Sequence, residues 1–123
     1  MAIAHQPVLE ARRAAIAQVQ LEISACLPPP AWPGEASLDC MVARSFRGPL
    51  VEGDRLRLRV RAYHPGDTPV AGDDAYPWEK LSRARYLEAC LDRDRDGWHA
   101  RVAGCVGLIQ RPTDAPSLAL AAA

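Results

Sequence analysis

Two stretches of the sequence alternate between apolar side chains and other residue types, and they constrain the fold more than any other feature. Most even positions of residues 38–46 are apolar, while residues 56–62 combine apolar even positions with arginine at the odd ones. A period of two places apolar side chains on one face of a β-strand. Between the stretches, Gly48-Pro49 and Gly53-Asp54 have turn chemistry. The sequence therefore predicts two antiparallel strands joined by a long loop.

Residues 17–25 alternate in the same way and predict the first strand of the chain. The competing prediction is a helix over residues 9–24, because most of its residue types favour helices. That helix would point Val19, Leu21 and Ile23 in widely separated directions. We therefore favour the strand.

The remainder of the chain predicts short elements between long loops. We expect loops over residues 27–37 and 63–77, a short helix over 78–83, and strands over 84–91 and 98–109, the last after an Asp96-Gly97 turn. Eleven prolines in 123 residues suit such a chain better than long helices do. The prediction is an all-β domain, and the alternative left open is that residues 8–24 and 78–93 are both helical.

The length is that of one domain with a core of its own. We expect residues 1–13 to be a loose lead-in with a short helical turn over 8–15. Residues 14–110 are the predicted domain. Residues 111–123, rich in proline and alanine, are expected to be a disordered tail.

Charge and composition limit the classes of partner. Fifteen basic residues balance fifteen acidic ones, which argues against nucleic acid and other polyanions as partners. No apolar stretch approaches the roughly 20 residues of a membrane-spanning helix, so no membrane partner is expected. Since the start at Met1 lacks the features of a signal peptide, we expect a cytoplasmic protein. The alternative is export, periplasmic or secreted, after removal of a signal peptide.

Four cysteines allow three disulfide pairings, among which the sequence does not choose. No CxxC pair occurs, and the spacings match no zinc ribbon. We therefore expect structural thiols, reduced in a cytosol and paired after export. The four are Cys26, Cys40, Cys90 and Cys105.

The most prominent candidate surface is a stripe of arginines spaced to line one face of one strand. This arginine stripe consists of Arg55, Arg57, Arg59 and Arg61. It could bind phosphates or an acidic partner. We favour a solvated face on which guanidinium groups pair with acidic side chains of neighbouring strands. Trp32 and Trp78, which the sequence places beside loops, complete the candidate partner-binding residues.

Residues 92–97 copy the opening of a calcium-binding loop, Asp-Arg-Asp-Arg-Asp-Gly. At the position of the glutamate that closes such a loop, this chain has Ala103. Two arginines also separate the carboxylates. An acidic turn explains these residues more simply. His64 and His99 show no metal-ligand spacing. We therefore expect no metal, no cofactor and no catalytic residue. The enzymatic alternative is a hydrolase built from a Cys, a His and an Asp that converge in space.

The order of strands and turns also supports a family resemblance. It rests on the strand over residues 17–25, Ser45-Phe46-Arg47-Gly48 ending the next strand, Gly53-Asp54 before the third, and the strands over 85–91 and 98–109. This pattern resembles netrin-like domains, the OB-like barrels shared with tissue inhibitors of metalloproteinases and with bacterial proteins. The resemblance implies a small OB-like (Greek-key) barrel of about five strands, with one short helix between the third and fourth.

The resemblance also implies a function without catalysis. The inhibitors bind catalytic zinc through an N-terminal cysteine, but this chain begins Met1-Ala2-Ile3, so protease inhibition is not carried over. What remains is a binding or accessory module that engages a protein or small ligand through the two long loops or a barrel face. The alternative is single-stranded nucleic-acid binding of the OB type through the arginine stripe.

Overall fold

The structure is a computed structural model that describes residues 6–64, 66, 75–100 and 102–118. In chain order, its elements are α1 (Gln6–Ala14), β1 (Ala17–Leu27), β2 (Gly34–Arg47), β3 (Arg55–Tyr63), β4 (Tyr76–Pro77), α2 (Trp78–Arg83), β5 (Tyr86–Asp94), β6 (Gly97–His99), the 3₁₀ helix η1 (Ala103–Cys105) and β7 (Val106–Ile109). The helix predicted over residues 78–83 is confirmed as α2.

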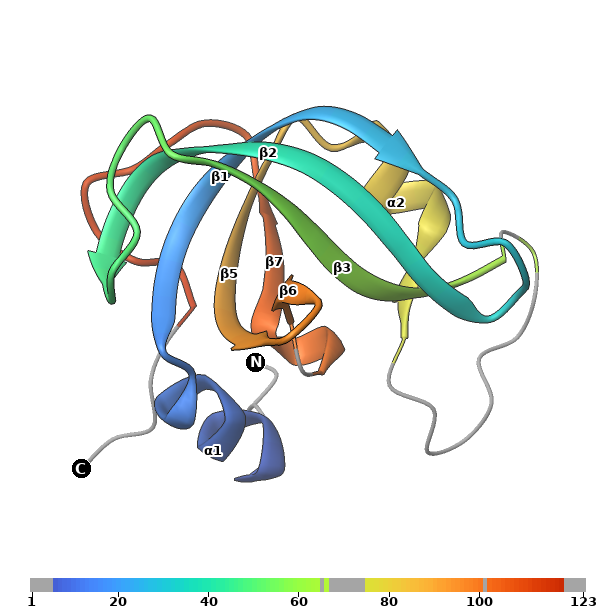
Figure 1. Cartoon of the computed structure of the whole chain (residues 1–123), viewed down its shortest axis with the longest axis horizontal. Coiled ribbons are helices and arrows are strands. Elements are labelled where there is room, and N and C mark those ends of the chain that lie inside the picture. Colours follow the sequence, from blue (N-terminus) through green and yellow to red (C-terminus); the bar gives the residue numbers. More distant parts are fainter. Residues whose placement is uncertain (1–5, 65, 67–74, 101, 119–123) are drawn as a thin grey trace.

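Five strands close into a barrel in the order β1-β2-β3-β6-β5, with β5 pairing back onto β1 (Figure 1). All these pairings are antiparallel except that of β3 with β6. The short helix α2 lies between the third and fourth barrel strands in the chain. The fold is therefore the predicted small all-β, OB-like barrel. Two strands lie outside the closed ring, β4 beside β3 and β7 beside β5.

The alternating sequence pattern determines which side chains fill the barrel. In β2 and β3 the register pairs Leu38 with Leu58 and Asp39 with Arg57, so apolar and charged positions fall on opposite faces. Leu38 and Leu58 are fully buried, as is Val19 of β1. The strand prediction for residues 17–25 is thus confirmed, and the competing long helix is wrong.

Two predicted boundaries are corrected. The loop expected over residues 27–37 ends early, because β2 begins at Gly34 and pairs with Ala62. The single strand expected over 98–109 is broken into β6, η1 and β7. β6 pairs with β3 through Trp98 and His99 and also pairs with β5, whereas β7, after η1, runs in the same direction along β5 alone.

Both ends of the described chain are more ordered than expected. The short helical turn expected over residues 8–15 is present as the longer α1, Gln6–Ala14, and this part of the expected lead-in is packed, with Ala11 buried beside Cys90 and Cys105. A side chain at Gly104 would lie 2.5 Å from Val8 Cγ1, so α1 can pack this closely on η1 only over a glycine. Residues 111–118, expected to be disordered, lie against β1 and β5. Within the described part of the chain, every helix is too short or too polar to cross a bilayer.

Candidate functional site

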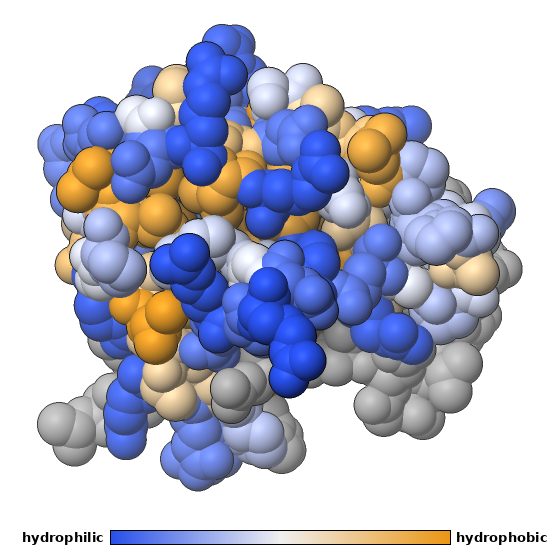
Figure 2. All heavy atoms as spheres, viewed as in Figure 1, coloured by the Kyte–Doolittle hydropathy of each residue, from blue (hydrophilic) through white to orange (hydrophobic). Residues whose placement is uncertain are grey.

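The outer surface of the barrel has two contrasting polar faces. The covered face lies on β1 and β5, where α1 and residues 113–118 pack over it; the open face lies on β2, β3 and the tip of the β5–β6 hairpin. Hydrophilic side chains extend across much of the side of the molecule where β2 and β3 lie in front (Figure 2). The covered face consists of Gln18, Gln20, Glu88 and Cys90; the open face consists of Glu35, Asp39, the arginine stripe, Asp94 and His99.

Glu88 is the centre of the covered face and is fully buried. Its two carboxylate oxygens accept hydrogen bonds from the side-chain amides of Gln18 and Gln20, at 3.0 and 2.9 Å. They also accept bonds from the backbone N–H groups of Ser117 and Leu118, both at 2.7 Å. Four N–H donors thus compensate the buried carboxylate. Nothing in the local sequence indicated this role, because the donors lie 29 to 70 residues away.

On the open face, arginines of β3 lie opposite acidic residues of β2. The register pairs Arg57 with Asp39 and Arg61 with Glu35. Arg57 Nε donates to Asp39 Oδ1 at 3.0 Å, with the two side chains 64% and 46% exposed. Arg57 and Arg59 thus have carboxylate partners on neighbouring strands, as the favoured interpretation predicted for the stripe, whereas Arg55 lies opposite Met41.

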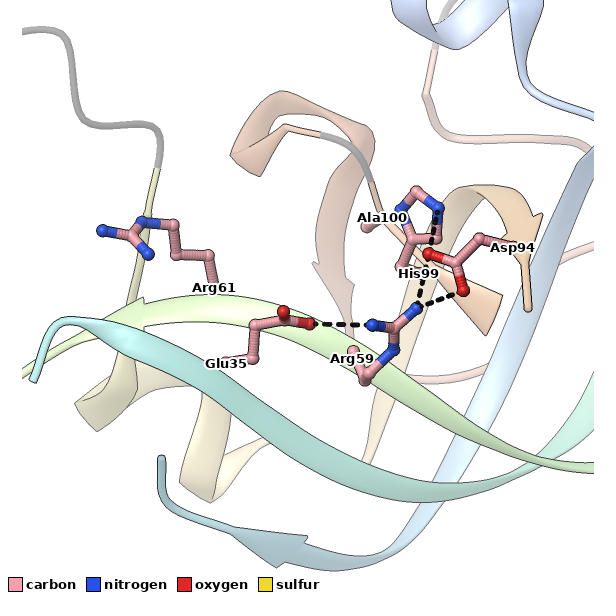
Figure 3. Close-up of a pocket in the computed structure, with 6 residues that line it drawn as sticks. All are labelled: Glu35, Arg59, Arg61, Asp94, His99 and Ala100. Atoms are coloured by element: carbon pink, nitrogen blue, oxygen red, sulfur yellow. Dashed lines mark hydrogen bonds and ion pairs between the residues drawn. The ribbon is translucent and has the colours of Figure 1, made fainter. Parts of the chain in front are cut away.

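Arg59 is the most enclosed arginine of the stripe, with a side chain only 22% exposed. Its Nη2 donates to both oxygens of Asp94, at 2.8 and 2.9 Å, while Nη1 lies 3.4 Å from Glu35 Oε2 (Figure 3). The hydrogen bond to Asp94 raises the pKa of Arg59, with a further contribution from the charge of Glu35. Arg59 Nε is shielded from solvent and finds no acceptor among the described residues. The guanidinium is thus clamped between β2 and β5.

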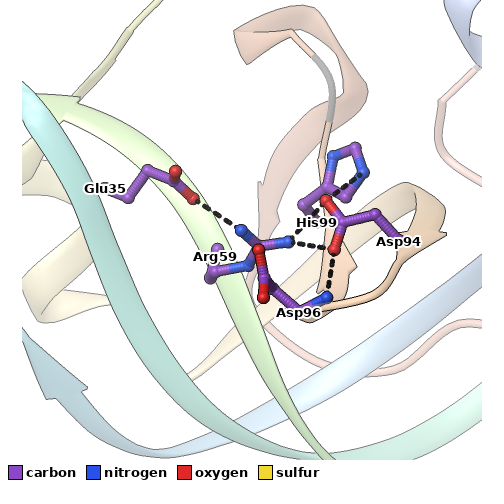
Figure 4. A network of polar contacts seen from close by, with 5 residues as sticks. All are labelled: Glu35, Arg59, Asp94, Asp96 and His99. Atoms are coloured by element: carbon purple, nitrogen blue, oxygen red, sulfur yellow. Dashed lines mark hydrogen bonds and ion pairs between the residues drawn. The ribbon is translucent and has the colours of Figure 1, made fainter.

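Asp94 ends β5 and is held from several directions (Figure 4). Besides Arg59, it accepts a hydrogen bond from the Asp96 backbone N–H at 2.8 Å, and His99 Nε2 lies 3.5 Å away. The bond from Arg59 and then that from Asp96 lower the pKa of Asp94. The calcium-like stretch is therefore an acidic hairpin turn, with Gly97 at φ 113°. Among the described residues, no cluster of three His, Cys, Asp or Glu side chains could hold a metal.

Two shallow hollows flank the arginine stripe. The first, of about 240 Å³, lies at the Arg59 end and is lined by Glu35, Arg59, Arg61, Asp94, His99 and Ala100 (Figure 3). The second, of about 400 Å³, lies at the other end and is lined by Ser24, Asp39, Cys40, Arg55, Leu56 and Arg57. The open face is therefore concave in two places as well as charged, and the four arginines of the stripe line these hollows.

No family model, curated protein or solved structure matches this chain. We therefore infer its function from the geometry of its own residues.

Trp32 and Trp78, the other predicted site residues, lie together, and neither lines the two hollows of the open face. Their ring centroids are 6.0 Å apart, and His64 meets Trp32 edge-on at 5.1 Å. Both tryptophans also pack against the core. They are thus partly structural. Residues 65 and 67–74 of the second predicted loop lie outside the described residues.

Cys40, on the inward face of β2, is poorly suited to be the nucleophile that the hydrolase alternative requires. Burial raises the pKa of Cys40 to about 12, so this thiol is neutral at physiological pH and a poor nucleophile. His99 does lie near Asp94, but Arg59 Nη2 already binds both oxygens of that carboxylate. The arrangement is suited to charge recognition.

Proposed function

We propose that this protein is a non-catalytic binding module that docks a partner protein through the open face. The observation that carries the proposal is the contrast between the two faces. The chain seals the covered face with its own segments, while charged side chains of β2 and β3 such as Asp39 and Arg57 remain half-exposed or exposed. A rigid sheet with an exposed charge pattern is a suitable docking surface, because charge complementarity gives specificity and fast association.

The pattern of charges favours a protein over a uniformly charged polymer. Along the open face, positive and negative groups alternate between adjacent strands, as Arg57 beside Asp39 and Arg59 beside Glu35 show. A partner with the reversed pattern would place acidic groups against the arginines and basic groups against the carboxylates. The two hollows would receive its protruding side chains. The netrin-like resemblance, which implies a binding or accessory module, agrees with this proposal.

A charge inversion tests the proposal without removing the local ion pair. The double variant Arg57→Asp with Asp39→Arg keeps the net charge and the cross-strand pair but reverses the pattern that a partner meets. The matched control is Glu79→Arg with Arg83→Glu, which inverts an exposed pair on α2. Each protein is immobilised and challenged with an extract of the source cells, and retained proteins are quantified by mass spectrometry. We expect a protein retained by the wild type and the control and lost with the inverted variant. Identical retention by all three would refute the proposal.

Single-stranded nucleic acid is the second candidate, favoured by the position of the stripe. In OB folds the strand 2–3 face is the surface that binds oligonucleotides, and all four arginines lie on the third strand of this barrel. Such binding would weaken steeply with salt and would be lost with Arg55→Ser and Arg57→Ser. Fluorescence anisotropy with a labelled oligothymidylate at low salt measures it. Because carboxylates pair with Arg57 and Arg59 at the middle of the stripe, our proposal predicts no binding.

A further inference from the structure

The structure brings the four cysteines together two by two, and the two pairs differ in geometry. Antiparallel pairing of β5 with β7 matches Tyr86 with Ile109 and, three steps on, Ala89 with Val106. One further step along the same register brings Cys90 opposite Cys105, which directly precedes β7. Directly opposite residues of an antiparallel ladder have Cα atoms about 4.5–5.5 Å apart. This separation lies within the range of about 4.4–6.8 Å that a disulfide spans.

Cys26 and Cys40 have a less favourable relation. They lie on β1 and β2, but Cys26 pairs with Leu38, and Cys40 pairs with Ile23. The two thiols are therefore diagonal neighbours, for which a separation of about 7–8 Å is typical. Such a spacing exceeds what a disulfide bridges without backbone movement.

The surroundings support the first pair. Cys90 and Cys105 are each 1% exposed and belong to one small buried cluster with Ala11 and Ala15 of the α1 region. After burial, Cys105 contributes to raising the pKa of Cys90, as Cys26 does for Cys40, so the pairs are distinguished by register and by their shared cluster. No other cysteine belongs to this cluster, so the pair has no competitor nearby.

We propose that Cys90 and Cys105 are a disulfide site that closes under oxidising conditions, while Cys26 and Cys40 stay reduced. The bond would link β5 to η1 beneath α1. It would reinforce the covered face next to Glu88 and leave the open face unchanged. This inference concerns the scaffold and does not depend on the proposed docking function.

Glutathione disulfide can serve as the oxidant. One cysteine thiolate attacks it, forming a mixed disulfide and releasing one glutathione thiolate; the second cysteine thiolate then displaces the other glutathione. Two electrons pass to glutathione, and the two cysteine protons end on the two glutathione thiolates released. Because burial raises the pKa of Cys90 to about 12 in the folded protein, thiolate formation requires opening of the site. We therefore expect the bond to form mainly during folding.

The test is refolding of the full chain from denaturant in buffer with reduced and oxidised glutathione. Remaining thiols are alkylated, and proteolytic peptides are mapped by mass spectrometry. We expect alkylation at two of the four cysteines, Cys26 and Cys40, and one linked peptide pair that joins Cys90 to Cys105. Dithiothreitol should restore four alkylated cysteines. A linked pair that contains Cys26 or Cys40, or a folded product with all four alkylated, would overturn the proposal.

A matched pair of variants checks the effect on stability. In Cys26→Ser with Cys40→Ser, the urea midpoint should still rise on oxidation, as in the wild type. In Cys90→Ala with Cys105→Ala, the midpoint should be the same with and without oxidised glutathione. The peptide map of the wild type decides the question even if a variant fails to fold.

Discussion

The covered and open faces differ in where their charged groups find partners. On the covered face, Glu88 takes its four hydrogen bonds from two glutamines and from the backbone of residues 117 and 118. On the open face, Arg57 and Arg59 donate hydrogen bonds to exposed carboxylates. The buried carboxylate of Glu88 is thus bound by neutral donors away from water. The charged groups of the open face instead form ion pairs with one another at the surface.

This difference assigns separate roles to the two faces. A buried carboxylate with satisfied oxygens is costly to disturb, because any lost donor leaves it uncompensated. Exposed ion pairs contribute little to stability, since water solvates their groups almost as well. We therefore infer that the covered face stabilises the barrel, and that the open face is free to vary for recognition.

The largest expected effect comes from removing the segment that closes the covered face. Deletion of residues 112–123 takes away the two backbone donors to Glu88, the bonds of Thr113 to Gln20 and the contact of Leu118 with the α1 cluster. We expect a loss of about 3 kcal/mol in the free energy of unfolding, from hydrogen bonds to a charged group. Urea denaturation measures it. Deletion of residues 119–123 alone is the control and should cost much less. Equal stability of the two truncated chains would mean that the segment does not seal the face.

A smaller loss is expected for Glu88→Gln. The amide retains one acceptor oxygen but places an NH₂ group where the other oxygen accepted hydrogen bonds. The donors to that second oxygen therefore lose their acceptor. We expect a cost of about 2 kcal/mol, and no more than that of the longer deletion, because residues 113–118 can detach and admit water. Hydrogen exchange of the Ser117 and Leu118 amides should quicken. Glu22→Gln is the control, since Glu22 is only partly buried. An unchanged exchange rate at Ser117 would contradict the assigned role of Glu88.

Much of the barrel could be predicted from local patterns. The alternation in β1, β2 and β3 identifies the core positions, because a strand with one buried face must repeat every two residues. Gly48 and Gly53, at φ 97° and 93°, mark the turns of the loop between β2 and β3, where the backbone adopts conformations that favour glycine. Pro77 before α2 located that helix, since proline suits a helix start.

The covered face could not be predicted in this way. Gln18, Gln20 and Glu22 alternate with apolar residues, which is the pattern of a solvated strand face. Gln18 and Gln20 are in fact buried, because residues 113–118 fold back over them. No local signal shows that a segment about 95 residues further on supplies the missing partners. The break in the strand expected over residues 98–109 also lies at a long-range contact, since it occurs at η1, on which α1 packs.

On the open face, disruption of a single ion pair should hardly change stability. A double-mutant cycle with Arg57→Ala and Asp39→Ala should give a coupling energy below about 0.5 kcal/mol, as is typical of exposed pairs. Added salt should reduce it further. Urea denaturation of the four proteins at low and high salt measures both quantities. A coupling comparable with the effect of Glu88→Gln would erase the distinction between the two faces.

The smallest effect concerns the acid limb of the stability profile. The hydrogen bond from Arg59 lowers the pKa of Asp94 in the folded protein below its ordinary value of 3.8. The unfolded chain therefore binds this proton at a higher pH than the folded one. The contribution of Asp94 is present above that ordinary value and is lost as the pH falls through the lowered folded pKa. Asp94→Asn should flatten the decline of stability below pH 3.8, while leaving its slope near neutrality unchanged.

Urea midpoints measured across the acid range test this, with Asp114→Asn as a control that lies outside the Arg59 network. A steeper acid decline in Asp94→Asn would mean that Arg59 does not favour the charged carboxylate, and that the open face is not organised around this contact.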